Sequence, residues 1–417
     1  MMKSEKTKPA IFYGNVVVAA TVVIFTVAWG ANRSFGVFLN PMLTEFGWSR
    51  ASISGAFTLA MIVMGLSGFV AGRMTDRFDP RIVIITCTLF LGAGYFLASM
   101  IQSVWQFYIV YGLMTGIGLS MSPPLMSLVS RWFVKRRALM ASIVASGPAF
   151  GNMAMPLVFS GVVYSLGWRH SFLIMSGMVT FFILSATVFI KRDPGEMGLV
   201  PFGMEESSAG QNPLQNEGFL VSEAIRTRQY WLISFIFFCD FFLMNVVTVH
   251  IVIHAMDLGI PGTKAASVLS VASGVCIFAR VIIGAIGDRV GYKPTFAFCL
   301  ILAVISFAIL LMAESLSMLY VFAVIFGFGL WSAGSLLTAM TATLFGLKSH
   351  GSIYGSIFIS GSIGGAFGPV LIGYLYDING SYSIGFRVCF LIAVFSLIAL
   401  LAIKPLKRTA KSNLPLT

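Results

Sequence analysis

Acidic residues are scarce in this chain, and so are histidine and cysteine. Only 15 of the 417 residues are Asp or Glu, four are His and five are Cys. The cysteines are Cys87, Cys239, Cys276, Cys299 and Cys389. They form no CxxC pair and no cluster with histidine, which argues against a structural zinc site and against a disulfide framework. We therefore expect neither a metal nor a bound cofactor.

Signatures of hydrolytic and nucleotide-driven chemistry are missing as well. The sequence has no HExxH zinc motif, no Ser-His pattern of the triad type and no GxxxxGK[ST] phosphate loop. We expect that the chain is not an enzyme. Any work that it performs would then draw on an ion or solute gradient and not on bound ATP.

Apolar residues dominate what is present. They make up 58% of the chain, against 10% charged residues, and they gather in runs of about 20, the length that crosses a bilayer as a helix. The sequence therefore predicts an all-α membrane protein with 12 transmembrane helices. The predicted runs are 13–39, 50–71, 82–101, 104–126, 138–164, 170–190, 230–254, 265–287, 294–312, 317–341, 352–375 and 386–403.

The net charge of +12 gains its meaning from where the cations lie. With the twelve runs as spans, 21 of the 27 Lys and Arg residues fall on the side of the N-terminus. By the positive-inside rule, both termini are cytoplasmic and the protein is a multi-pass protein of the cell (inner) membrane. This placement argues against nucleic acid as a partner. Because the first apolar run is too long for a signal peptide, we expect the N-terminus to be retained.

An internal repeat divides the chain into two halves. Residues 72–77 (GRMTDR) recur as residues 284–289 (GAIGDR), 212 positions later, and three further matches follow at offsets up to 218. Six helices per half make the repeat parallel, which is typical of transporters. We expect an N-terminal six-helix bundle at 1–190, a cytoplasmic linker at 191–228 and a C-terminal six-helix bundle at 229–417.

The repeated segment resembles the loop signature G-x-x-x-D-R-x-G-x-K/R of the major facilitator superfamily. The second copy, residues 284–293, is complete, whereas the first has Asp79 in place of the second glycine. The resemblance implies two pseudo-symmetric bundles around a central cavity. It also implies gating contacts at the cytoplasmic helix ends. The gating residues would be Asp76, Arg77, Asp288 and Arg289, and simple topology anchoring is the alternative for each.

Two further segments resemble the monocarboxylate porters and the related oxalate/formate branch. Residues 132–141 (WFVKRRALMA) are similar to the Y-F-x-K-R-R-x-L-A stretch that precedes helix 5 of those proteins, and residues 276–280 (CIFAR) to their helix 8 segment D-x-x-x-R. Cys276 stands where that segment has aspartate, and the acid-Gly-Gly-Trp-Gly-Trp signature of animal members is missing before helix 1. A bacterial branch is favoured over an animal one.

Arg280 is the most informative residue, because it lies inside an otherwise apolar run. It precedes Asp288 by eight residues, or about 12 Å along a helix, which places it near the middle of a membrane core roughly 30 Å thick. The repeat puts Gly68 at the equivalent position, so the charge belongs to one half only. Since a guanidinium binds a carboxylate through two parallel hydrogen bonds, we expect Arg280 to bind the substrate. A structural ion pair is the alternative.

Asp240 is the acid predicted to lie deep within a helix, at a depth comparable to that of Arg280. In the family that this chain resembles, an acid one turn before the arginine is the proposed proton carrier. Cys276 occupies that position here. A thiol, which usually titrates near pH 8.5, suits this role poorly. We expect Cys276 to line the substrate site and Asp240 to carry the proton. A fixed Asp240–Arg280 ion pair without proton traffic remains the alternative.

Three other residues complete the predicted substrate site. Arg33 lies where the family often has a lysine that attracts the anion, although its long stem also permits it to reach outer headgroups. Asn32 precedes it as a possible hydrogen-bonding group of the cavity. Trp331 lies in a stretch of small residues and would shape or close the cavity, with ordinary packing as its alternative.

These residues predict a secondary transporter that works by alternating access. The expected activity is proton-coupled symport of a small monocarboxylate such as lactate or pyruvate, whose substrate class comes from the resemblance alone. The alternative is carboxylate exchange of the oxalate/formate type, for which Arg33 would supply a second cation. A membrane sensor that binds ligand without transport is a third possibility. The expected partners are a small organic anion, a proton and membrane lipids, and the expected functional unit is a monomer.

Overall fold

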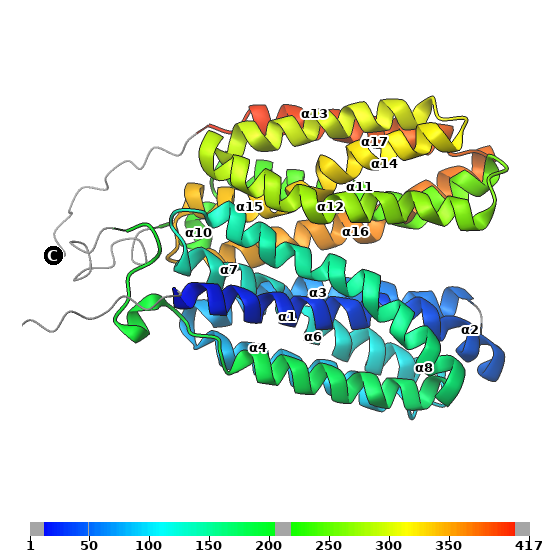
Figure 1. Ribbon diagram of the computed structural model, residues 1–417, viewed down its shortest axis with the longest axis horizontal. Coiled ribbons are helices and arrows are strands. Elements are labelled where there is room, and N and C mark those ends of the chain that lie inside the picture. Colours follow the sequence, from blue (N-terminus) through cyan, green and yellow to red (C-terminus); the bar gives the residue numbers. More distant parts are fainter. Residues whose placement is uncertain (1–11, 49, 205–217, 405–417) are drawn as a thin grey trace, which may run out of the picture.

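The computed structural model describes residues 12–48, 50–204 and 218–404. This described part is helical throughout, with two isolated β-bridges and no strand. Eleven of its helices are long and apolar enough to cross a membrane. Figure 1 shows the helices running roughly parallel to the long axis of the molecule. The all-α membrane fold predicted from the apolar runs is confirmed.

The helices of the N-terminal half form one bundle, which lies at the bottom of Figure 1. Its elements are α1 (Tyr13–Arg33), α2 (Phe35–Phe46), α3 (Arg50–Arg77), α4 (Pro80–Ala98), α5 (Val104–Phe107), the π-helix η1 (Tyr108–Thr115), α6 (Gly116–Leu119), α7 (Ser122–Trp132) and α8 (Arg137–Thr187).

The helices of the C-terminal half form the second bundle, at the top of the same view. Its elements are α11 (Arg228–Asp257), α12 (Gly262–Val290), α13 (Tyr292–Leu311), α14 (Leu316–Phe328), α15 (Leu330–Phe345), α16 (His350–Asn379) and α17 (Ser383–Leu401). Between the bundles the chain forms the short helices η2 (Pro194–Met197) and α10 (Val221–Ala224). We propose 1–190, 191–228 and 229–417 as the boundaries of bundle, linker and bundle.

Helix α8 contains two of the predicted spans. It is 51 residues long, and Gly167, with φ 76° and ψ 163°, breaks its helical geometry between the runs 138–164 and 170–190. The positive φ is readily accessible to glycine, because glycine has no Cβ. With α8 counted as two crossings, the described residues contain the twelve spans that the sequence predicts.

Several spans are interrupted where the sequence analysis predicted continuous helices. The first span turns at Ser34 between α1 and α2, and the fourth contains the π-helix η1. The tenth breaks at Gly329, whose φ and ψ of −81° and −99° separate α14 from α15. Apolar periodicity does not reveal such breaks, yet interrupted helices are typical of transporter binding sites because they free backbone groups within the membrane.

Two seams join the bundles. In the first seam, α3 packs against α16, and in the second, α8 packs against α12. Glycines occupy equivalent places in both: a Cβ on Gly72 would overlap the backbone of Gly351, and one on Gly284 would lie 2.9 Å from the carbonyl oxygen of Ala138. Glycine therefore allows close backbone approach in each seam.

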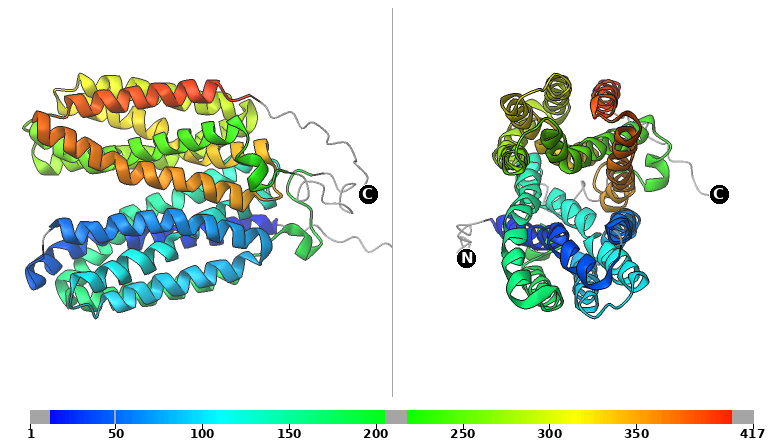
Figure 2. Two further views of the ribbon diagram at one scale, coloured as in Figure 1. Left: turned by 180° about the vertical axis from the view of Figure 1, so that it is seen from behind. Right: turned by 90° about the vertical axis from the view of Figure 1, so that its right-hand side faces the viewer.

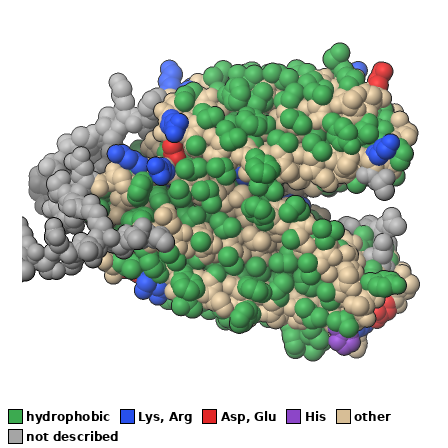
Figure 3. Space-filling model, in the orientation of Figure 1, with side chains coloured by type: hydrophobic (Ala, Val, Ile, Leu, Met, Phe, Trp, Pro, Cys, Tyr) green, Lys and Arg blue, Asp and Glu red, His purple; other side chains and the backbone are tan. Residues whose placement is uncertain are grey.

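The surface of the molecule fits a membrane-embedded transporter. Apolar side chains cover much of the face seen in Figure 3. Exposed large apolar residues of the described part include Leu157, Phe181 and Phe278, which are 71%, 66% and 74% exposed. The same view shows a cleft between the bundles at one end and contact between them at the other. The two views of Figure 2 show the parallel bundles from behind and along their long axis. We call the closed end, which holds Asp76 and Asp288, the latch end.

Candidate functional site at the centre of the bundles

Arg280 on α12 binds backbone carbonyl groups from both bundles. Its Nε and Nη2 donate to the carbonyl oxygen of Trp331 on α15, at 3.4 and 3.3 Å. Its Nη1 donates to the carbonyl oxygen of Ala145 on α8, in the opposite bundle. The half-buried guanidinium therefore bridges the second seam at mid-helix. These carbonyl oxygens accept hydrogen bonds from the guanidinium, but they are neutral and do not balance its positive charge.

Asp240 on α11 is the acid of this centre. Its side chain is buried, Oδ1 has no hydrogen-bond partner, and Oδ2 faces Gly334 on α15. The carboxyl interacts electrostatically with Arg280. However, the two ion pairs within 4.0 Å among the described residues are Arg131–Asp76 and Arg169–Glu45, so Asp240 and Arg280 are not in direct contact. The Asp240 carboxyl and the Arg280 guanidinium can therefore each bind another partner.

Cys276 and Trp331 lie beside Arg280. Cys276 is one helical turn before Arg280 on α12, and its Sγ donates to the carbonyl oxygen of Trp331 at 3.4 Å. Trp331 is the second residue of α15, two positions after the break at Gly329. The Trp331 ring is half-buried and packs against Phe326 at 5.8 Å between ring centroids. Three residues of the predicted substrate site thus meet at one backbone carbonyl.

Arg33 and Asn32 lie together at the end of α1, within the N-terminal bundle. Arg33 interacts electrostatically with Tyr111 of the π-helix η1, and its guanidinium lies 5.8 Å from the ring of Trp29. Asn32 is fully buried, and its side-chain amide oxygen and nitrogen have no partner. The Tyr111 hydroxyl donates to the Asn32 carbonyl oxygen at 3.5 Å. None of the contacts of Arg33 reaches the Arg280 centre.

Asp76 at the latch end caps a helix of the opposite bundle. It accepts hydrogen bonds from the backbone amides of Gly351 and Ser352 at 3.1 and 2.8 Å, in the first turn of α16. The Ser352 hydroxyl donates to it at 2.6 Å, and Arg131 on α7 forms an ion pair with it at 3.2 Å. A carboxylate at a helix N-terminus is stabilised by unpaired amides and by the helix dipole.

Asp288 repeats the arrangement in the other direction. It accepts hydrogen bonds from the backbone amides of Ala138 and Leu139, both at 2.9 Å, in the first turn of α8. The Tyr292 hydroxyl donates to it at 3.1 Å, and no arginine in the described part of the chain forms an ion pair with this aspartate. Each bundle therefore caps the other at the latch end, through residues that the sequence repeat relates.

The motif arginines behave differently from the motif aspartates. Arg77 and Arg289 are exposed, and neither forms an ion pair with a residue of the described ranges. The charge partner of Asp76 is Arg131, which the sequence analysis placed among the cytoplasmic cations without a role. The Ala145 carbonyl, Tyr111 and Ser352 were also missed. A backbone carbonyl has no signal in the sequence. Arg131 lies in the last turn of α7, and Ser352 lies in the first turn of α16.

Comparisons with known proteins agree with this geometry. The sequence profile described as "Major Facilitator Superfamily" matches residues 18–289 and, in a second match, residues 233–416. Monocarboxylate transporter 13 of Rattus norvegicus is 26% identical over 383 residues, covering 90% of this chain and 85% of that protein. Monocarboxylate transporter 2 of Homo sapiens is 24% identical over 407 residues, covering 93% of this chain and 85% of that protein.

Solved structures share the fold. The human organic anion transporter MFSD10 superposes with a TM-score of 0.72 at 14% identity, covering 94% of this chain and 100% of that one. The proton:xylose symporter XylE gives a TM-score of 0.74 at 14% identity, covering 93% of this chain and 94% of that one. Because the matched segments of the sequence profile together span both bundles, and the fold agrees, this chain belongs to the Major Facilitator Superfamily.

Proposed function

We propose that this protein is a proton-coupled symporter of the monocarboxylate porter branch, which carries a small monocarboxylate such as lactate or pyruvate. The observation that supports this most directly is the hydrogen bonding of Arg280. Its guanidinium lies at mid-helix with backbone carbonyls as its partners, and no carboxylate of the described residues lies within 4.0 Å of it. A substrate carboxylate would give it two charge-assisted hydrogen bonds in place of neutral ones.

The contact with Ala145 offers a way to couple binding to movement. Arg280 of the C-terminal bundle donates a hydrogen bond to a carbonyl of the N-terminal bundle. A carboxylate that draws the guanidinium toward itself would weaken this contact across the second seam. The neighbouring Ser142–Ser335 hydrogen bond, at 2.6 Å, also crosses between bundles and would remain. Substrate binding would thus change the balance between conformations by its different contacts in each.

Asp240 is the proposed proton carrier. A buried carboxyl with one unpartnered oxygen favours its protonated form, whereas a nearby cation favours its charged form. When a substrate anion neutralises Arg280, the second influence weakens and Asp240 takes up a proton. The anion and the proton would then cross together, and the central site would carry no additional charge.

The gating and substrate roles of the other residues belong to the same proposal. Asp76 and Asp288 hold the latch end closed, and their release would open it, with Arg77 and Arg289 as neighbouring cations. Cys276 and Trp331 line the site beside Arg280. Arg33 attracts the anion along the N-terminal bundle, and Asn32 is a hydrogen-bonding group of the cavity. The proposed setting is the cell membrane with both termini in the cytoplasm, and the proposed unit is a monomer.

Uptake into proteoliposomes tests this function. Purified protein is reconstituted, and uptake of labelled lactate and labelled oxalate is measured with and without an inward proton gradient. Symport predicts that lactate accumulates when the gradient is present and that collapse of the gradient abolishes accumulation. Uptake that requires a preloaded counter-anion and ignores the gradient would replace symport with exchange. Saturable binding without any uptake would show a sensor.

A further inference from the structure

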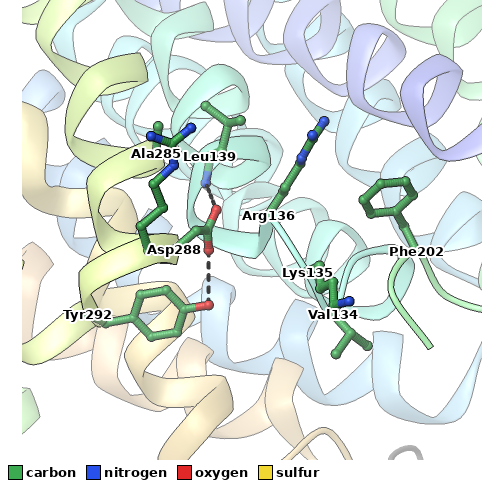
Figure 4. A pocket seen from close by; sticks show the side chains of 9 residues that line it. Val134, Lys135, Arg136, Leu139, Phe202, Ala285, Asp288 and Tyr292 are labelled. Carbon is green, nitrogen blue, oxygen red and sulfur yellow. Dashed lines mark hydrogen bonds between the residues drawn. The ribbon is translucent and has the colours of Figure 1, made fainter. Parts of the chain in front are cut away.

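A basic cavity lies at the latch end, outside the central site. It measures about 770 Å³, and both bundles line it. Lys135 and Arg136 come from the loop between α7 and α8, whereas Arg289 and Tyr292 come from the end of α12 and the start of α13. Figure 4 shows Asp288 and Tyr292 on one side of this cavity and Lys135 and Phe202 on the other.

The cations of this cavity lack anionic partners. The lining contains three cations and one acid, Asp288. The carboxylate oxygens of Asp288 already accept from Ala138, Leu139 and Tyr292. No ion pair within the described ranges involves Lys135, Arg136 or Arg289. The cavity therefore has an excess of positive charge that an anion would balance.

The backbone holds one of these cations in an unfavourable conformation. Arg136 has φ 62°, and it is the non-glycine residue with positive φ in the described part of the chain. Its guanidinium lies 5.6 Å from the ring centroid of Phe202. Left-handed backbone at a non-glycine residue is costly and tends to occur where surrounding structure or function requires it. Here it presents Arg136 beside the start of α8.

The position of the cavity favours a lipid over a dissolved anion. α8 begins at Arg137, α12 ends at Val290 and α13 begins at Tyr292, so the cavity lies at the level where spans end and headgroups begin. α12 carries an exposed apolar row at four-residue spacing, whose last member, Val290, is next in sequence to Arg289 of the cavity lining. The row consists of Phe278, Ile282, Ile286 and Val290, which are 74%, 47%, 38% and 65% exposed. Arg289 lies seven residues after Ile282, on the same helix face.

We propose that this cavity binds the phosphate of an anionic phospholipid, with Lys135, Arg136 and Arg289 around the headgroup and an acyl chain along the apolar row of α12. The cations come from both bundles, so the bound phosphate connects them across the second seam. The lipid therefore stabilises the closed latch in addition to the contacts of Asp288. The proposal does not depend on the identity of the substrate, because none of the residues of the central site lines this cavity.

Lipid titration of the full-length protein tests the proposal. The protein in an uncharged detergent is titrated with short-chain phosphatidylglycerol, with phosphatidylcholine of the same chain length and with inorganic phosphate, and the unfolding temperature is followed. We expect saturable stabilisation by phosphatidylglycerol alone. Equal stabilisation by phosphatidylcholine would overturn the headgroup assignment, and an equal effect of inorganic phosphate would overturn the lipid as its source.

Variants locate the site. The double variant Lys135→Gln/Arg289→Gln is expected to raise the dissociation constant for phosphatidylglycerol about 30-fold, and Lys135→Gln alone about 5-fold. The matched control Arg73→Gln/Arg228→Gln removes two exposed cations outside the cavity and is expected to bind like the unsubstituted protein. If the control loses as much affinity as the double variant, the binding is non-specific and the proposal fails. Should the double variant not fold, the single variant gives the same comparison.

Discussion

The two seams between the bundles begin alike and diverge toward their middle. At the latch end, Asp76 caps α16 in the first seam and Asp288 caps α8 in the second. About two turns further along, the first seam has Gly68, which packs near Pro123 and Phe358, and the second has Arg280. The contacts at the latch end are thus equivalent in the two seams, whereas at this level the second seam has the charged Arg280 and the first has Gly68. The closing contacts are therefore symmetric, and the central charge belongs to the second seam, where we propose that the substrate carboxylate binds.

The seams also differ in the side chain that contacts the capping aspartate. Asp76 has an ion pair with Arg131, and both side chains are mostly buried, at 9% and 7% exposed. Asp288 has the Tyr292 hydroxyl in place of an arginine. A buried ion pair is costly to break from one side, because the remaining charge has no water to solvate it. The first seam should therefore tolerate loss of its aspartate less well than the second.

The largest effect is expected from removing the charge of the second seam. Arg280→Gln should lower lactate uptake at least about 30-fold, because the substrate carboxylate loses its partner in a low-dielectric site. Arg280→Lys keeps the charge but not the planar fork, so it should recover part of the uptake. Initial rates in proteoliposomes give both values. Full activity of Arg280→Gln would remove the difference between the seams on which the proposal rests.

The next effect concerns the proton. Asp240→Asn keeps the shape of the side chain and removes its titration, so concentrative uptake driven by a proton gradient should be lost. Exchange of labelled for unlabelled lactate at equilibrium should continue, since it needs no net proton movement. In the unsubstituted protein, uptake should rise as the external pH falls, and this dependence should disappear in the variant. Unchanged gradient-driven uptake by Asp240→Asn would return Asp240 to a structural role.

The latch ends of the two seams can be compared directly. Asp76→Asn should destabilise the protein by about 3 kcal/mol, because Arg131 is left buried without its counter-charge. Asp288→Asn should cost about 1–2 kcal/mol, the usual effect of weakening hydrogen bonds to a charged group. Thermal unfolding of the purified variants gives the order. Equal destabilisation would mean that Arg131 contributes little to the latch.

The last comparison tests the glycine packing of the first seam, where Gly68→Ala should give the smallest effect. A Cβ at Gly72 overlaps backbone atoms of Gly351, which have little freedom to move, so Gly72→Ala should cost about 1–3 kcal/mol. The matched variant Gly68→Ala places its Cβ 3.4 Å from the nearest side-chain atoms, an ordinary contact, and should be close to neutral. The comparison uses the same thermal unfolding assay. If both alanines are tolerated, close backbone contact is not what joins α3 to α16.

The sequence predicted the fold because its signals are local and repeated. Apolar runs of bilayer length and the motif at residues 72–77 and 284–289 predicted the spans and the superfamily, and both are confirmed. The break at Gly329 was not predicted, because a glycine within an apolar run has the same composition in a straight or a broken helix. Gly167, by contrast, lies between two predicted runs. Residue spacing therefore predicted positions along each helix, but it did not predict the contacts between helices.

The site was predictable only in part for the same reason. The depths of Arg280 and Asp240 followed from residue counts along their helices, and the structure places them within electrostatic reach of each other. Their lack of direct contact depends on side-chain conformation, which no pattern encodes. The Ala145 carbonyl, as a partner of Arg280, requires knowledge of how α8 packs against α12. The assignment of substrate and proton roles to these residues stays a prediction.

The most direct test of the central claim is a binding comparison between lactate and lactamide, its neutral amide. Competition against labelled lactate is measured on the purified protein and on Arg280→Gln. If Arg280 binds the substrate carboxylate, lactate should compete at least about 30-fold better than lactamide on the unsubstituted protein, and Arg280→Gln should lose this preference. Equal competition by the two compounds, or a preference that survives in Arg280→Gln, would contradict the account.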